Sequence, residues 1–472
     1  MAFSPRIVAF LCEGCSQHAA DLAGRERRGY PQALLPIRVP CSGRIDPGLV
    51  LRAFRGGAEG VLVAACHPQD CRHGGSSAAE ARCAILGRLL EALGIERARL
   101  RFEGIGASEA ERFAAVARDM AATVSALGPL DYARRALGRD PASPPAEKAP
   151  RRRPSRSTHR LPRVAIHWNA ACGGCDEAIL DEFPDLSGLT ERAQLVYWPL
   201  AIDGRRADVE RLKDGALDLA LVSGAVRLQE DAEWAVLLRR KARRLVALGA
   251  CADTGGVVGL GNLAGAAAIA RTARSGAVRA SPASAREPAP LLPMALPLSE
   301  LVPVDAVIPG CPPPPEVLRA ALERLLADEV PAYEVLAPPR ALCETCPRRA
   351  TRPERPALVE LRRLASHAPD PERCFLDQGH LCHGPATRQG CGGSCIAVNM
   401  PCRGCSGAPE GAPEPGAAMI GAVGALLAAG GLESASLAGG LADVAGSFYP
   451  YGLAAATLPE ALRSEGEEEG GP

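Results

Sequence analysis

Aromatic residues, net charge and long apolar runs are all scarce in this 472-residue chain. Aromatic side chains make up 4% of the residues, and 54 basic side chains balance 54 acidic ones. Balanced charge gives no bulk attraction to nucleic acid, so we expect no nucleic-acid partner. No uninterrupted apolar segment approaches the roughly 20 residues that cross a bilayer, so we expect no membrane insertion. The best candidate, residues 417–429, is interrupted by Gly421 and Gly424.

A secretory signal is also lacking. The apolar run at residues 7–11 stops at Cys12 and Glu13, without a small-residue cleavage site. Arg27 and Arg28 are not followed by an apolar stretch, which argues against twin-arginine export. We therefore expect a cytoplasmic protein. Thiols stay reduced in that compartment, so the 18 cysteines indicate metal or redox chemistry rather than disulfides.

The length of the chain predicts several domains. Changes in composition suggest five segments: a small α/β unit (1–130), a Pro- and Arg-rich linker (131–160), a larger α/β unit (161–335), a cysteine-rich segment (336–408), and helical patterns with an acidic end (409–472). The linker has too few apolar residues to bury a core. Its basic cluster could contact an acidic partner, but a solvated linker is the simpler interpretation.

In the first unit, cysteines follow the predicted strands. The apolar runs 7–11, 35–39 and 61–65 predict buried parallel strands. Each run leads into cysteine, and the five thiols concerned are Cys12, Cys15, Cys41, Cys66 and Cys71. Ligands gather beyond the carboxyl ends of parallel strands, so we expect these thiols to converge on one metal centre. The alternative is buried free thiols, and Cys83, inside a helical pattern, is interpreted as such a packing residue.

The second unit repeats this arrangement. Its predicted strands are residues 164–168, 194–199, 217–222, 245–248 and 306–308. The first leads into Cys172 and Cys175, the fourth into Cys251 and the fifth into Cys311. Residues 264–297 are rich in Ala, Ser and Pro and are predicted to form a surface excursion.

Beyond residue 336 the periodicity disappears and cysteines crowd together. The eight thiols are Cys343, Cys346, Cys374, Cys382, Cys391, Cys395, Cys402 and Cys405. Such a segment is typical of a domain folded around metal. Four-cysteine sites hold zinc or iron–sulfur clusters, and an isolated CxxC can also be a redox dithiol. Several four-cysteine sets in one chain favour an electron relay over structural zinc.

Short motifs then point to a known family. Residues 161 to about 450 resemble the small subunit of cytoplasmic methyl-viologen-reducing nickel–iron hydrogenases, in the motifs CGGCDE, LGACA, PGCPPPPE, CETCPR, CFLDQGHLCHGPATRQGC and PCRGC. Residues 1–130 resemble the delta subunit of the same complex, in FLCEGCS, RVPCSGRID and GVLVAACHPQDC. The chain therefore looks like a natural fusion of two subunits.

The resemblance implies a flavodoxin-like parallel α/β fold for residues 161–335, three 4Fe–4S clusters and one 2Fe–2S cluster. The implied ligands are Cys172, Cys175, Cys251 and Cys311 (proximal 4Fe–4S); Cys391, Cys395, Cys402 and Cys405 (medial 4Fe–4S); Cys343, Cys346, Cys374 and Cys382 (distal 4Fe–4S); and four of Cys12, Cys15, Cys41, Cys66 and Cys71 (2Fe–2S). Asp253 and Thr254 depart from the family pattern, which has a small residue followed by an aromatic one there.

The resemblance also implies an activity. Dihydrogen is split at the nickel–iron centre of a separate large subunit, and this chain passes the electrons to a heterodisulfide-reductase-like or other acceptor. Glu177 is a candidate proton-relay carboxylate, and a carboxylate favoured by a helix N-terminus is the alternative. His167, His380 and His383 are interpreted as packing or surface residues.

Two other functions remain open at this point. One is a zinc-scaffolded interaction protein, and the other is the cluster-bearing component of a quinone-reductase-like complex.

Overall fold

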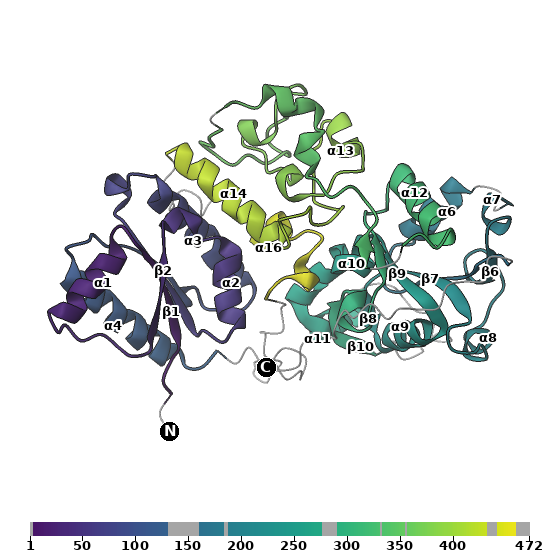
Figure 1. The fold of residues 1–472 in the computed structure, drawn as a ribbon, viewed down its shortest axis with the longest axis horizontal. Helices are drawn as coiled ribbons and strands as arrows, with labels where there is room; N and C mark the ends of the chain where they lie inside the picture. The colour runs from purple at the N-terminus through teal and green to yellow at the C-terminus, as the bar shows by residue number, and fades with distance from the viewer. Residues whose placement is uncertain are drawn as a thin grey trace.

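The computed structural model describes residues 3–130, 160–183, 187–275, 290–330, 333–354, 356–431 and 441–458. Nearly all of the predicted linker and the acidic end lie outside these ranges. Figure 1 shows an N-terminal α/β unit on one side, a larger α/β unit on the other, and the cysteine-rich segment above them.

The N-terminal unit is a four-stranded parallel sheet with helices on both faces. Its strands are β1 (Ile7–Cys12), β2 (Leu34–Val39), β3 (Gly60–Ala65) and β4 (Leu100–Gly104), in the order β2-β1-β3-β4. Helices α1 (Ser16–Arg25) and α4 (Ala110–Leu127) cover one face, and α2 (Pro47–Arg55) and α3 (Gly75–Ala92) cover the other. Three strands match the predicted runs, while β4 was not predicted from the sequence.

Strand β2 corrects one expectation. Its apolar sequence predicts a buried strand, but Leu35 and Ile37 are 49% and 45% exposed. The reason is its place at the edge of the sheet, where β1 is its single partner among the described strands.

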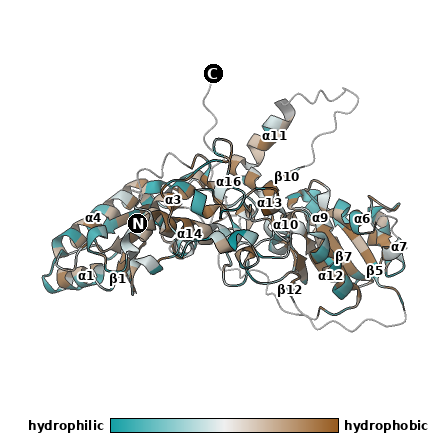
Figure 2. Ribbon diagram, turned by 90° about the horizontal axis from the view of Figure 1, so that it is seen from above, coloured by the Kyte–Doolittle hydropathy of each residue, from teal (hydrophilic) through white to brown (hydrophobic). Residues whose placement is uncertain are grey.

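The larger unit is a six-stranded parallel sheet, which confirms the predicted fold class. Its strands are β5 (Arg163–Trp168), β6 (Gln194–Tyr197), β7 (Leu217–Ser223), β9 (Ala242–Leu248), β11 (Ala306–Ile308) and β12 (Glu334–Val335), in the order β12-β11-β9-β7-β5-β6. Strand β7 is buried along its whole length, and β5 and β7 are among the hydrophobic elements in Figure 2. Buried parallel strands read as continuous apolar runs, which is why the sequence revealed them.

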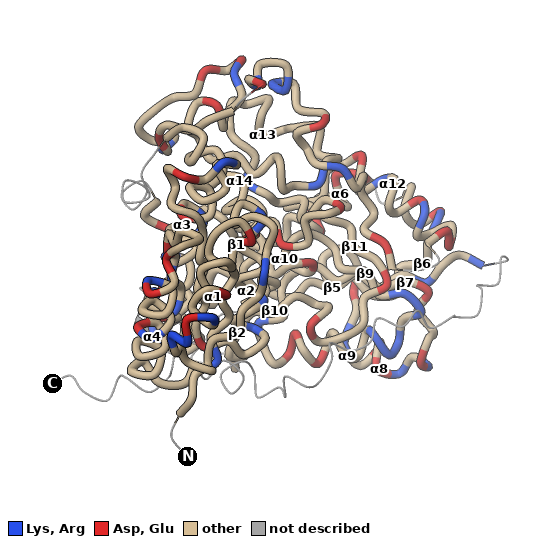
Figure 3. Tube along the Cα trace, turned by 60° about the vertical axis from the view of Figure 1, so that its left-hand side comes forward, with Lys and Arg blue, Asp and Glu red and all other residues tan. Residues whose placement is uncertain are grey.

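Helices cover both faces of this second sheet. One face packs on α6 (Gly174–Glu182), α7 (Ser187–Thr190) and α12 (Pro315–Leu326), and the other on α8 (Arg206–Glu210) and α9 (Gln229–Lys241). The short helix α10 (Gly249–Thr254) follows β9 directly. Acidic and basic residues are interspersed over the outer helices, for example along α12 (Figure 3).

Residues 264–297 are not simply a surface excursion. They contain α11 (Gly265–Ser275) and β10 (Leu291–Leu296), which pairs antiparallel with β8 (Val226–Leu228). Met294 and Ala295 on β10 are buried, and the Asn262 side chain bonds both backbone groups of Ala295. The strand escaped prediction because proline and alanine dominate the surrounding sequence.

The cysteine-rich segment consists of short 3₁₀ helices, isolated bridges and the one-turn helix α13 (Ser394–Ala397). Its small core mixes apolar side chains with two cysteines: Leu342, Phe375, Leu376, Ile396, Cys382 and Cys402. Helices α14 (Pro415–Ala429) and α16 (Val444–Phe448) follow it. In the described ranges, none of the helices combines the length and apolar character needed to cross a membrane.

Helix α14 lies between the N-terminal unit and the cysteine-rich segment (Figure 1). Its apolar side chains share one continuous core with α2 and α3. The C-terminal helical region is therefore packed into the body of the molecule.

Candidate metal centres

The first cysteine set forms where the neighbouring parallel strands β1 and β3 of the N-terminal sheet end. The Sγ atoms of Cys12, Cys15 and Cys66 all lie within 4.8 Å of one another. Ser16 helps to hold them, because its hydroxyl accepts from the Cys12 backbone N–H at 2.8 Å and donates to the Ala64 carbonyl at 2.7 Å. The sheet thus brings together thiols that are up to 54 residues apart.

Hydrogen bonds and burial give the three thiols of this first set different pKa values. The Cys15 thiol, assisted by the backbone N–H groups of Ser42 and Gly14, lowers the pKa of Cys12 to about 5. The same bond to Cys12, together with burial, raises the pKa of Cys15. Burial raises the pKa of Cys66 to about 11, and neighbouring thiolates add to the rise. One thiolate is therefore stabilised before any metal binds.

The other two cysteines, Cys71 and Cys41, have different neighbours. Cys71 interacts directly with Cys66. Although burial opposes the shift, the backbone N–H groups of His73, Gly75 and Ser76 lower the pKa of Cys71. Cys41 is outside the mutual 4.8 Å group. Its Sγ packs against the backbone of Gly75, where an added Cβ would lie 2.6 Å from the sulfur.

The second set lies at the carboxyl edge of the larger sheet. Cys172 and Cys175 follow β5, Cys251 lies in α10 after β9, and Cys311 follows β11. Burial raises the pKa of Cys175 most strongly, and the thiolates of Cys251, Cys311 and Cys172 raise it further. Burial likewise raises the pKa of Cys311 to about 11. Four sulfurs that repel one another as thiolates are a donor set suited to a cationic centre.

Glycines leave room beside these sulfurs. A Cβ on Gly249 would lie 2.3 Å from the Sγ of Cys175, and a Cβ on Gly256 would lie 2.5 Å from the Sγ of Cys251. Both glycines have positive φ, +81° and +53°. Close backbone approach to the sulfurs and a four-cysteine donor set fit an iron–sulfur cluster.

A buried carboxylate fixes the helix that carries Cys175. Asp176 is 1% exposed and accepts hydrogen bonds from Trp198 Nε1 at 2.9 Å and Ser223 Oγ at 3.0 Å. Burial raises the pKa of Asp176, while these two donors oppose the rise. The neighbouring Glu177 is exposed in the same first turn of α6.

The cysteine-rich segment contains two further neighbourhoods. Burial raises the pKa of Cys343 to about 12, with Cys346 and Cys374 adding to the rise. Burial also raises the pKa of Cys382 to about 12, and its thiolate neighbours are Cys343 and Cys374.

The second neighbourhood is built around Cys405. Burial raises the pKa of Cys405, and the thiolates of Cys391 and Cys395 add to the rise. Burial raises the pKa of Cys402 to about 12, with contributions from both Cys382 and Cys405. Cys402 therefore lies between the two neighbourhoods.

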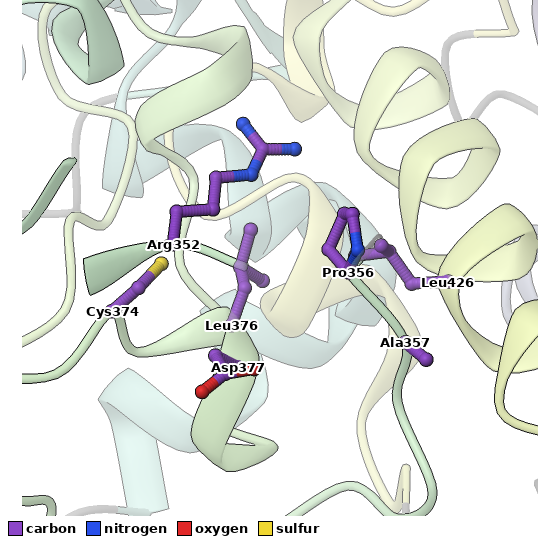
Figure 4. A pocket seen from close by; sticks show the side chains of 7 residues that line it. All are labelled: Arg352, Pro356, Ala357, Cys374, Leu376, Asp377 and Leu426. Atoms are coloured by element: carbon purple, nitrogen blue, oxygen red, sulfur yellow. The ribbon is translucent and has the colours of Figure 1, made fainter. Parts of the chain in front are cut away.

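The sets follow one another in space. The backbone N–H of Cys311, from the second set, donates to the Sγ of Cys405. At the other end, Cys374 and Leu426 of α14 line the same narrow pocket, together with Arg352, Pro356, Ala357, Leu376 and Asp377 (Figure 4). The succession runs from the larger sheet through the cysteine-rich segment to α14.

Three contributors were missed from sequence. Ser16 and Asp176 each directly follow a cysteine motif, and this position was the available signal. Tyr451 gave no signal: its carbonyl accepts from Thr254 Oγ1 at 2.6 Å, and burial followed by Cys311 and Cys405 raises its pKa to about 12.

The remaining cysteine and the histidines lie as expected of packing residues. Cys83 packs against the core shared by α3 and α14. His167, His380 and His383 are buried, and His383 Nε2 is 2.7 Å from the Ser447 carbonyl oxygen.

The parallel α/β fold and the clustered cysteines define an iron–sulfur oxidoreductase component of the hydrogenase small-subunit type. Residues 7–128 match the family model of the methyl-viologen-reducing hydrogenase delta subunit, and residues 172–325 match that of the NADH ubiquinone oxidoreductase 20 kDa subunit. The chain is 30% identical over 313 residues to the G-type subunit of the F420-non-reducing hydrogenase of Methanothermobacter thermautotrophicus, covering 65% of this chain and 98% of that protein. It belongs to the family of F420-non-reducing hydrogenase subunits and joins G-like and D-like parts in one polypeptide.

Two further relatives match shorter stretches of the chain. The D-type iron–sulfur subunit of the F420-non-reducing hydrogenase of Archaeoglobus profundus is 42% identical over 133 residues, which cover 28% of this chain and 97% of that protein. The A-type subunit of the ferredoxin/F420H2-dependent CoB–CoM heterodisulfide reductase of Methanosarcina acetivorans is 41% identical over 127 residues, which cover 27% of this chain and 16% of that protein.

Proposed function

We propose that this chain carries electrons from the nickel–iron centre of a hydrogenase large subunit to an acceptor, using three 4Fe–4S clusters and one 2Fe–2S cluster. The observation that carries the proposal is the succession of the three cysteine sets beyond the N-terminal unit, in which Cys311 neighbours Cys405 and Cys402 neighbours Cys382. Bound clusters would supply one-electron chemistry. A chain that holds several centres in series suits electron transfer better than structural support.

The ligand sets follow this succession. We assign the set at the larger sheet (Cys172, Cys175, Cys251 and Cys311) to the proximal cluster. The medial set is Cys391, Cys395, Cys402 and Cys405, and the distal set is Cys343, Cys346, Cys374 and Cys382. For the 2Fe–2S cluster we assign Cys12, Cys15 and Cys66, whose sulfurs lie close to one another, and Cys71, whose thiol bonds that of Cys66.

The residues of this chain have two further roles in the proposal. Asp176, held by Trp198 and Ser223, positions the first turn of α6 and with it Cys175. Glu177 is the candidate proton-relay carboxylate, since it is exposed beside Cys175. Its location in the first turn of α6 also favours a negative charge for purely structural reasons.

A heterodisulfide-reductase-like protein is the proposed acceptor. The Methanosarcina relative carries a region similar to this chain inside a heterodisulfide reductase component, and the length of that match fits the N-terminal unit. Direct fusion of such a unit to a reductase would shorten the electron path. The reducing cytoplasm fits the function, because it keeps cysteines available as ligands.

Anaerobic co-purification with the partner large subunit tests the proposal. We expect iron and acid-labile sulfide in similar amounts, nickel in the partner, and hydrogen-dependent viologen reduction. Equimolar zinc without sulfide would instead indicate a zinc-scaffolded interaction protein.

The match of residues 172–325 to the 20 kDa quinone-oxidoreductase subunit supports a second candidate, a quinone-reductase-like relay. Viologen reduction that requires a donor other than hydrogen would favour this second function.

A further inference from the structure

Helix α14 is wedged between two parts of the molecule that are far apart in sequence. On one side, Ile420, Val423 and Leu427 share a buried core with α2 and α3 of the N-terminal unit. On the other side, the Leu426 carbonyl accepts from the Leu358 backbone N–H at 2.8 Å, in the cysteine-rich segment. A single helix thus contacts both parts directly (Figure 1).

The approach of α14 to α3 is very close. A Cβ on Gly424 would lie 2.7 Å from Arg82 Cγ and 3.1 Å from the Arg82 backbone nitrogen. Because part of this obstacle is backbone, a larger side chain at position 424 cannot be accommodated by a rotamer change alone. The packing therefore requires glycine at this position.

Arg82 ties α14 to the loop that follows Cys41. Its Nε donates to the Gly421 carbonyl of α14 at 3.0 Å, and its Nη1 donates to the Gly43 carbonyl at 2.7 Å. A weaker contact of 3.4 Å reaches the Ile45 carbonyl. The same loop borders the first cysteine set, since the Ser42 backbone N–H bonds the Cys12 sulfur.

The segment after α14 strengthens the same contact. Tyr449 lies among Leu51, Leu89 and Leu93 of the N-terminal unit. Its hydroxyl donates to Glu414 Oε1 at 2.8 Å, immediately before α14 begins. The interface is thus apolar at its centre, as stable interfaces between subunits are, and Arg82 and Tyr449 add hydrogen bonds to it.

We propose that α14 is a docking helix that keeps the N-terminal unit bound to the rest of the molecule without the covalent linker, and that Arg82 positions the loop beside the first cysteine set on it. Gly421 and Leu426 are five residues apart, a rise of about 7.5 Å along a helix. In this short distance α14 passes from the Cys41 loop to the pocket lined by Cys374. Given the proposed electron-transfer function, α14 would set the separation between the distal and N-terminal centres.

The test is to cut the full chain within residues 131–160. A specific protease sequence is inserted there, and the purified, folded protein is cleaved anaerobically and analysed by native mass spectrometry and size exclusion at about 1 μM. We expect the two pieces to remain together. Separation of the pieces in the otherwise unchanged protein would overturn the proposal.

Variants then locate the docking contact. Gly424→Leu should weaken the association of the cleaved pieces at least 100-fold, whereas Gly24→Leu, at a helical glycine whose Cβ would meet nothing within 4 Å, should leave it unchanged. Arg82→Met keeps most of the side-chain volume and should weaken association about tenfold. Unchanged association in both interface variants would place the docking contact elsewhere.

Neither readout needs a hydrogenase partner or turnover. A failure of the electron-transfer function would therefore leave this result standing, and the reverse also holds.

Discussion

The two parallel sheets carry cysteines at corresponding edges, but the surroundings shift the pKa values of the thiols differently. In the N-terminal sheet, hydrogen bonds from a neighbouring thiol and from backbone N–H groups lower the pKa of Cys12 to about 5, whereas the pKa values of Cys15 and Cys66 are raised. In the larger sheet, burial and mutual repulsion raise the pKa values of Cys175, Cys251 and Cys311. The first site is partly organised for a thiolate without metal, whereas the second depends on the charge of a bound centre.

The cysteine-rich segment extends this comparison. Both sheets have apolar cores of their own, but residues 336–408 surround a core in which cysteines stand beside a few apolar side chains. The dependence of local structure on metal should therefore increase from the N-terminal sheet, through the larger sheet, to this segment.

Removing all clusters should produce the largest effect. We expect amide hydrogen-exchange protection in residues 336–408 to fall at least 100-fold, because metal binding there also supplies folding free energy. Amides of β1, β3 and β7 should change less than tenfold, since these strands are buried in apolar cores. Equal loss of protection in the sheets and the segment would contradict the comparison.

Replacing one ligand of the larger sheet should produce the next largest effect. Cys251→Ser should remove the cluster proposed there, about four irons per chain, and stop hydrogen-dependent electron output. The 2Fe–2S spectrum of the N-terminal unit should remain, as measured by iron content and electron paramagnetic resonance.

Cys83→Ser is the matched control, because Cys83 packs in a core rather than in a set. If Cys251→Ser lost the signals of both the larger-sheet cluster and the 2Fe–2S cluster, the two sheets would not take up their clusters independently.

Much of this arrangement could be predicted from the sequence. Continuous apolar runs revealed β1, β3, β5, β7 and β9, because buried parallel strands need no polar face. The same pattern gave the wrong burial for β2, since an apolar sequence does not tell whether a neighbouring strand or helix will cover it. Strand β10, which pairs with the short antiparallel β8, was missed because proline and alanine dominate the surrounding sequence.

The position of α14 could not be predicted in the same way. Its sequence is apolar on every side. This pattern indicates burial but does not show which elements the helix packs against. The contact to α3 joins residues more than 300 positions apart, Arg82 and Gly421 for example. Likewise, the five N-terminal cysteines were recognised as a group, but only the fold shows that the sulfurs of Cys12, Cys15 and Cys66 are mutually close.

Three substitutions among the N-terminal cysteines test the comparison on a smaller scale. Cys66→Ser should abolish the 2Fe–2S spectrum, because Cys66 lies within 4.8 Å of both Cys12 and Cys15. Cys41→Ser should keep the spectrum, with at most a shift in its redox potential. A lost spectrum in Cys41→Ser combined with a retained one in Cys71→Ser would exchange the proposed roles of these two residues.

Lowering the pH should destabilise the larger sheet through one buried histidine. His167 on β5 is 8% exposed and stacks on Trp234 at a centroid distance of 4.4 Å. Burial lowers the pKa of His167 from 6.5 to about 4, while nearby Arg206 adds to this and Asn169 opposes it. The folded state therefore binds fewer protons than the unfolded state between pH 6.5 and 4, and stability falls as the pH drops through this window. Between pH 7 and 5.5 the expected loss is about 1 kcal/mol.

Tryptophan fluorescence can assign this loss to the larger sheet, because the protein's three tryptophans, Trp168, Trp198 and Trp234, all lie in that unit. His167→Phe retains a ring for the stack and should flatten the pH dependence of urea unfolding over that range. The same change at the exposed His18 should leave the dependence as it is. If His167→Phe keeps the full acid dependence, the destabilisation arises from other groups, and the neutral, buried imidazole does not distinguish the larger sheet from the N-terminal one.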